Sequence, residues 1–179
     1  MRGLWLNEEA TELLVAASHS HNTAVEVDAD SRPHTHRLMR VDVDPTSPEA
    51  YTVVGAVDLD GQASSMGPAP SPFTMATSPD GAHLMVTLAA GQAVLVLDAE
   101  TREEVERLPA GSDPRGLAFH ADHFCTYAWL DNQLVGWPLP GQEGERVQLV
   151  IGDDPTPLEV KQGQRIFNDA AFSKHGEFS

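Results

Sequence analysis

Residues 71–114, SPFTMATSPDGAHLMVTLAAGQAVLVLDAETREEVERLPAGSDP, contain four short runs of strand-forming residues separated by turn signals. Between the first two runs, Ser78–Gly81 reads Ser-Pro-Asp-Gly, with proline and glycine at the positions that a type I turn prefers. The third run belongs to AVLVLD, whose continuous apolar character predicts an inner strand covered on both faces. The stretch therefore predicts one unit of four antiparallel strands, over Phe73–Thr77, Leu84–Leu88, Val94–Leu97 and Val105–Leu108.

The same unit recurs on both sides. Pro72, Pro114 and Pro155 follow one another at intervals of 42 and 41 residues, each after a turn-forming segment. Downstream, Phe124–Ala128, NQLVGWPL and RVQLVIG correspond to the second, third and fourth strands. Upstream, NEEATELLVAAS aligns with SPDGAHLMVTLA. An insertion over Ser18–Thr35 separates this segment from the third strand, HRLMRVDVD. The pattern shows no counterpart of the first strand. The repeat predicts an all-β stack of about three units.

Composition excludes several classes of protein. Twenty-seven acidic and 11 basic residues give a formal charge of −16, which disfavours nucleic acid as a partner. No segment approaches the roughly 20 apolar residues of a membrane-spanning helix, so we expect no membrane span. Cys125 is the single cysteine, which rules out an internal disulfide. Its setting, FCTYAWL, predicts a buried structural thiol.

The central unit resembles the YVTN-type β-propeller repeat. The matching positions are the Ser78–Gly81 turn, Asp98 before Thr101, and the blade junction Gly111-x-x-Pro114-x-Gly116. The resemblance implies a partial β-propeller of about three four-stranded blades over residues 1–154. An open stack would leave a terminal apolar row without a neighbouring blade, and we expect this row to include Val94, Val96, Leu134 and Trp137.

A helix is predicted from Thr156 to about Phe167. Thr156 is suited to the N-cap, Pro157 to the first helical position, and Glu159 to the capping box. Val160 and Phe167 would lie on one side of this helix. The change from strand-forming to helix-forming residues predicts a second domain over residues 155–179.

This C-terminal segment resembles the start of the di-haem cytochrome c peroxidase family domain. Gly163, Phe167, Ser173, Gly176 and Ser179 match the family pattern, with Ile166 at a position where leucine is usual. The resemblance implies that Phe167 and Ser173 lie near a haem and that a Cys-x-x-Cys-His motif follows Ser179 directly. Since residues 1–179 lack this motif, we expect no haem c in this chain itself.

For the longer protein the same resemblance implies haem c, a cytochrome domain downstream in the same chain, and an electron-transfer partner. It also implies a periplasmic location and haem-dependent electron transfer or peroxidase-like oxidation. On this hypothesis residues 1–179 alone are not an enzyme. The alternative is a non-catalytic β-propeller that binds a protein or ligand, with the terminal helix as a blade-closing tail.

Four histidines lie in or beside the insertion: His19, His21, His34 and His36. In an extended strand, each closely spaced pair points to one face with about 7 Å between its members. Two opposed pairs would suit a shared metal ion. The other interpretations are a solvated loop on the rim of the propeller and a loop that faces the cytochrome domain.

Overall fold

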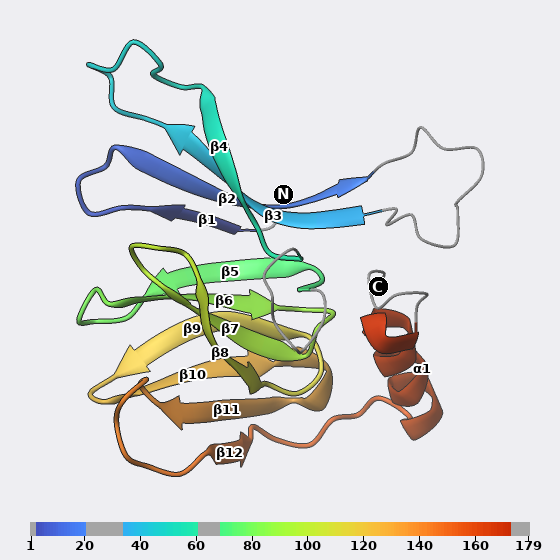
Figure 1. The fold of residues 1–179 in the computed structure, drawn as a ribbon. Helices are drawn as coiled ribbons and strands as arrows, with labels where there is room; N and C mark the ends of the chain where they lie inside the picture. Colours follow the sequence, from blue (N-terminus) through green and yellow to red (C-terminus); the bar gives the residue numbers. More distant parts are fainter. Residues whose placement is uncertain (1–2, 21–33, 61–68, 173–179) are drawn as a thin grey trace.

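The computed structural model describes residues 3–20, 34–60 and 69–172. Within them, twelve strands form three four-stranded antiparallel sheets, each with its strands in sequence order (Figure 1). Blade 1 comprises β1 (Gly3–Leu6), β2 (Glu12–Ser20), β3 (His34–Asp42) and β4 (Val53–Asp58). Blade 2 comprises β5 (Pro72–Thr77), β6 (His83–Leu88), β7 (Ala93–Asp98) and β8 (Glu104–Pro109). Blade 3 comprises β9 (Pro114–His120), β10 (His123–Ala128), β11 (Gln133–Pro138) and β12 (Val147–Val150).

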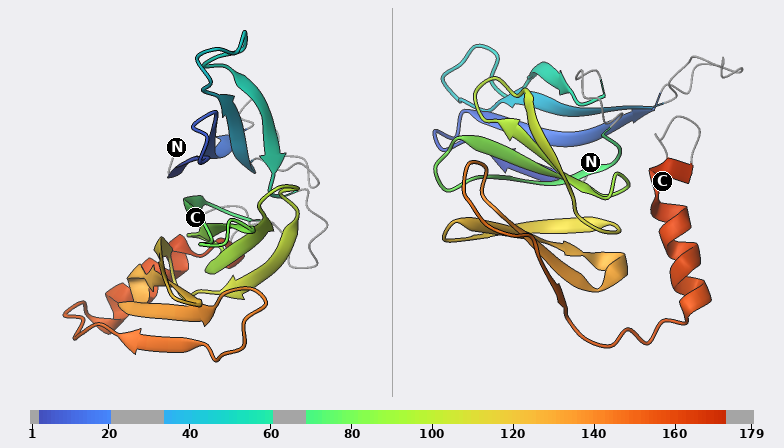
Figure 2. Two further views of the ribbon diagram at one scale, coloured as in Figure 1. Left: turned by 90° about the vertical axis from the view of Figure 1, so that its left-hand side faces the viewer. Right: turned by 60° about the horizontal axis from the view of Figure 1, so that its bottom comes forward.

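The three blades stack in chain order, and the second is buried between the others (Figure 2). One apolar cluster lies between blades 1 and 2 and includes Leu14, Leu38 and Leu95. A second lies between blades 2 and 3 and includes Val94 and Phe124. Because β6 and β7 contribute to both clusters, their central residues are fully buried. The prediction of an all-β, three-blade stack with an inner strand at AVLVLD is confirmed.

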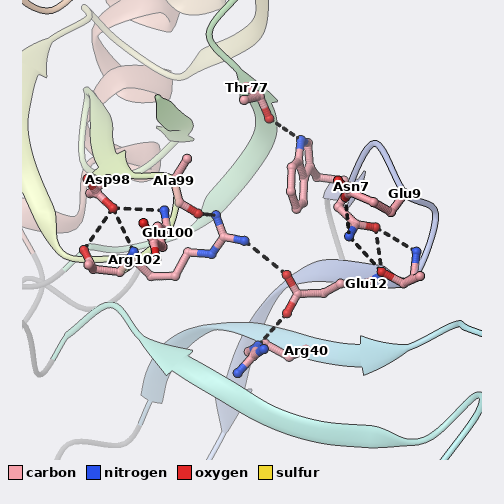
Figure 3. A network of polar contacts seen from close by, with 12 residues as sticks. Asn7, Glu9, Glu12, Arg40, Thr77, Asp98, Ala99, Glu100 and Arg102 are labelled. Atoms are coloured by element: carbon pink, nitrogen blue, oxygen red, sulfur yellow. Dashed lines mark hydrogen bonds and ion pairs between the residues drawn. The ribbon is translucent and has the colours of Figure 1, made fainter. Parts of the chain in front are cut away.

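Blade 1 has the first strand that the sequence pattern lacked. GLWL is too short to show a repeat, but β1 pairs with β2 and lies beside β5. A Cβ atom on Gly3 would clash with the carbonyl oxygen of Phe73, so glycine permits this close approach. The indole nitrogen of Trp5 donates a 2.7 Å hydrogen bond to Thr77 (Figure 3). Contacts with residues about 70 positions away thus define this strand.

The predicted insertion over Ser18–Thr35 is too long. Strand β2 continues to Ser20 and β3 begins at His34, since Ser18, His19 and Ser20 pair with His36, Thr35 and His34. The residues between them, 21–33, lie outside the described part of the chain.

The terminal row of apolar residues is also different from the prediction. Val94, Val96 and Trp137 are buried between blades 2 and 3, whereas Leu134 lies on the opposite, open face of blade 3. Cys125 pairs with Gly136 on that same face and is half-buried, not the fully buried thiol that its apolar setting predicted. Strand alternation explains both corrections, because Phe124, Thr126 and Ala128 take the inward positions on β10.

The C-terminal segment forms helix α1 (Leu158–Asn168), followed by one turn of 3₁₀ helix, η2 (Ala170–Phe172). The helix prediction is confirmed, but the capping box is wrong. Pro157 occupies the N-cap, and the backbone N–H of Thr156 donates instead to the Asp154 carboxylate at 2.9 Å. Among the described residues α1 is the sole α-helix, and its length and polarity do not suit it to crossing a membrane.

Candidate functional site

Helix α1 contacts the blades through its polar side. Arg165 forms a 2.7 Å ion pair with Asp131, which lies in the 3₁₀ turn η1 (Trp129–Asp131) between β10 and β11. One turn earlier in the helix, Lys161 pairs with Asp154 at 2.8 Å. Asp131 also accepts a 2.6 Å hydrogen bond from the backbone of Ser112 at the junction of blades 2 and 3. The Arg165–Asp131 pair therefore holds the helix against the edge of the stack, and the Lys161–Asp154 pair holds it to the segment that follows β12.

The other side of α1 is apolar and exposed. No residue of the helix is buried. Helical spacing places Gly163 among Val160, Ile166 and Phe167 on one side, and a Cβ atom on Gly163 would meet nothing within 4 Å. This orientation is the reverse of that usually seen in a surface helix, which buries its apolar side. The exposed apolar side chains on this side are Val160, Ile166 and Phe167, at 51%, 54% and 75% exposure.

The Lys161–Asp154 pair makes the stability of α1 dependent on pH. The hydrogen bond from Lys161, followed by that from the backbone of Thr156, lowers the pKa of Asp154 below its usual value. A carboxyl group whose pKa is lowered by folding stabilises the folded state above its unfolded pKa, and this stabilisation is lost as the pH falls. We expect the protection factors of the α1 amide protons, which are corrected for the intrinsic pH dependence of exchange, to fall below about pH 4. In Asp154→Asn these protection factors should be low already at neutral pH, and unchanged protection factors would contradict this role.

A pocket of about 330 Å³ lies where the end of α1 meets blades 2 and 3. Asp113, 3% exposed, accepts hydrogen bonds from Nε and Nη2 of Arg115 at 2.9 and 2.8 Å. The guanidinium carbon lies 5.0 Å from the ring centre of Phe73 and 4.5 Å from that of Trp129. The hydrogen bond to Asp113 raises the pKa of Arg115 and keeps it charged. The lining residues are Phe73, Ala89, Ala90, Asp113, Arg115, Phe167 and Asn168.

The sequence prediction included only Phe167 from this pocket. Asp113 and Arg115 occupy unspecified positions on either side of Pro114 in the junction motif, and no local pattern links them to Trp129. Phe167 lines the pocket and is largely exposed. Ser173 lies outside the described residues. That Phe167 and Ser173 lie near a haem stays a prediction.

The histidines are divided between two faces of blade 1. The register of β2 and β3 places His34 and His36 on the face shared by Ser18 and Ser20, and His19 on the other face. His36 is buried, with Nδ1 2.9 Å from the hydroxyl of Ser18 and 3.4 Å from the backbone nitrogen of Ser71. In the described part of the chain, no three His, Cys, Asp or Glu side chains gather as metal ligands would. Since His21 lies outside that part, a metal site of all four histidines stays a prediction.

Comparison with known proteins supports the fold. No protein-family model matches the sequence, and no curated protein matches it. The structure is similar to that of Kuenenia stuttgartiensis hydrazine synthase, with a TM-score of 0.64 and 12% identity over 79% of this chain and 46% of that one. It is also similar to a putative 6-phosphogluconolactonase from Bacteroides uniformis, with a TM-score of 0.52 and 15% identity over 87% of this chain and 41% of that one. This chain thus spans less than half the length of either neighbour.

At such identities the similarity concerns the fold alone. The stacked sheets and these neighbours together show that residues 3–20, 34–60 and 69–150 form a partial β-propeller of three four-stranded blades, with a short helix after the last blade.

Proposed function

We propose that this chain is the propeller portion of a larger, periplasmic protein of haem-dependent electron transfer, and that α1 is the first helix of its cytochrome c domain. The blades would belong to the YVTN type, and the downstream domain to the di-haem cytochrome c peroxidase type. The observation that carries the proposal is the reversed orientation of α1. Its ionic side contacts the propeller through Arg165, and among the described residues none buries Val160 or Ile166 on its apolar side.

An eleven-residue helix with no buried side chain requires a further partner. Helices this short are marginal in water by themselves, and most helical stability in proteins comes from packing of an apolar side. Gly163 lowers helix propensity further, by about 1 kcal/mol relative to alanine. It also leaves room for another backbone or a flat group to approach closely. A domain that packs on Val160 and Ile166 would bury this apolar side.

The haem in this proposal is attached outside residues 1–179. Covalent attachment needs two thiols and an axial histidine close together, and this chain has one cysteine, on the open face of blade 3. When bound, haem c would supply the one-electron chemistry. The part played by this chain is to position the downstream domain through α1 and to present the propeller as a docking scaffold.

The sequence of the longer reading frame provides the first test. We expect Cys-x-x-Cys-His within a few codons after Ser179. Expression with haem-maturation machinery should give a covalent Soret absorbance for the longer protein and none for residues 1–179. A verified stop codon directly after Ser179, or a longer protein without Soret absorbance, would overturn the proposal.

Substitutions at Gly163 test the role of α1 separately. Gly163→Trp in the longer protein should prevent close packing on this side, so we expect limited proteolysis between the two domains to be at least tenfold faster. Gly163→Ala should raise the helix content of residues 1–179. Gly152→Ala is the matched control, because a Cβ atom there also meets nothing within 4 Å and the residue precedes the helix. Equal proteolysis of Gly163→Trp and wild type would contradict docking on this side.

A non-catalytic β-propeller that binds a ligand is the second candidate function, and the pocket beside Arg115 favours it. The reading frame after Ser179 distinguishes the two candidates. If no haem motif is found there, ligand binding at this pocket is the better supported function.

A further inference from the structure

We propose that the pocket between Arg115 and Phe167 binds a small monocarboxylate with a flat apolar body. This site goes beyond the proposed electron-transfer function and needs no downstream domain. Its lining comes from three parts of the fold. Strands β5 and β9 contribute Phe73 and Arg115, the β6–β7 turn contributes Ala89 and Ala90, and the end of α1 contributes Phe167 and Asn168.

Arg115 keeps one recognition edge available. A guanidinium group carries five N–H donors in a planar fork. Nε and Nη2 use one edge to bind the two oxygens of Asp113. Nη1 has no hydrogen-bond partner among the described residues, so the Nη1–Nη2 edge can donate two parallel hydrogen bonds to a second carboxylate. Such paired bonds are the geometry in which arginine recognises carboxylates most specifically.

The surroundings hold this edge in place. The rings of Phe73 and Trp129 both contact the guanidinium, and Asp113 is almost fully buried. Arg115 therefore loses little conformational freedom when a ligand binds, which lowers the cost of binding. The nearby Asp113 carboxylate favours a ligand with a single negative charge, because a dianion such as phosphate would meet stronger repulsion at this distance.

The size and walls of the pocket indicate the body of the ligand. A volume of about 330 Å³ is at the lower end of the range for small-molecule sites. Phe73 and Phe167 supply aromatic walls, against which a flat apolar group packs well. The amide of Asn168 donates to the carbonyl oxygen of Gln164 at 2.8 Å, which fixes the side chain and leaves its Oδ1 as an acceptor for a hydroxyl substituent.

Benzoate is a suitable probe because it combines one carboxylate with one ring. We expect titration calorimetry on residues 1–179 to detect one benzoate site, and the fluorescence of Trp129 to change in parallel. Benzamide, which has the same shape without the charge, should bind at least tenfold more weakly, and inorganic phosphate should show no binding. Equal binding of benzoate and benzamide would overturn carboxylate recognition.

Arg115→Lys should weaken benzoate binding at least tenfold, because lysine cannot present the paired edge. Arg102→Lys is the matched control. Arg102 also contacts an aromatic ring, Trp5 at 5.3 Å, and pairs with a carboxylate, Glu12 at 3.1 Å, but it lies at the junction of blades 1 and 2 (Figure 3). The control should bind benzoate as wild type does. The proposal fails if both variants lose binding equally or if neither does.

Phe167→Ala provides a second variant in case Arg115→Lys does not fold. Phe167 is 75% exposed, so its loss should leave the melting temperature unchanged while weakening benzoate binding about threefold or more. Wild-type affinity in this variant would remove the aromatic wall from the proposal and overturn the site as described.

Discussion

Phe124→Ala is expected to lower the free energy of unfolding by about 3–5 kcal/mol, the usual cost of removing a fully buried phenylalanine side chain. Phe124 is 1% exposed and stacks on Trp137 with 5.3 Å between ring centres. Both rings belong to the apolar cluster between blades 2 and 3. The substitution would leave a cavity at this junction, because the sheets on either side cannot collapse without breaking their own strand pairing.

Urea unfolding followed by circular dichroism measures this effect. Val105→Ala is the control, since Val105 is 54% exposed on β8 and its truncation should change stability by no more than about 0.5 kcal/mol. A loss below about 1 kcal/mol in Phe124→Ala would mean that blades 2 and 3 do not share a packed core.

Residues 1–179 alone are expected to self-associate at micromolar concentration despite the charge of −16. The outer faces of blades 1 and 3 have no neighbouring blade in the structure described. Leu4 is 58% exposed on the first, where it pairs with Val15, and Leu149 is 59% exposed on the second, where it pairs with Leu134. Contiguous apolar surface of this kind drives association in water, and terminal repeats of an array need a polar cap to stay soluble.

Light scattering coupled to gel filtration tests this expectation. The double variant Leu4→Lys with Leu149→Lys places a charge on each open face and should shift the chain to monomer. Val105→Lys adds a charge at an exposed position away from both faces and should leave association unchanged. If the wild-type chain elutes as a monodisperse monomer and melts in one sharp cooperative transition, the open faces of blades 1 and 3 do not drive association.

Much of the propeller could be predicted because its signals are local. The Ser78–Gly81 turn and the alternation of Leu84, Val86 and Leu88 define two strands within a few residues of each other. The observed strands β5 to β8 differ from the predicted runs by one residue or none at each end. Turn chemistry and strand alternation act over short stretches of chain, so they appear in the sequence directly.

Less of the candidate site could be predicted from the sequence. The sequence predicted a helix near Thr156–Phe167, with Val160 and Phe167 on one side. It did not predict that the ionic side would contact the propeller, because the partner of Arg165 is Asp131, in a turn of another blade. It also predicted Phe167 as a site residue without the pocket that Phe167 lines.

The sequence by itself determined the all-β class, the four-strand repeat near 42 residues, and the position of helix α1. Only the tertiary structure decided that Gly3–Leu6 is a strand, that Trp137 lies inside the stack, and that Arg115 lies between Asp113 and two aromatic rings. The first set depends on backbone preferences and periodicity within one segment. The second depends on contacts between residues that are far apart in the chain, such as Gly3 with Phe73, and these arise only when the blades pack against each other.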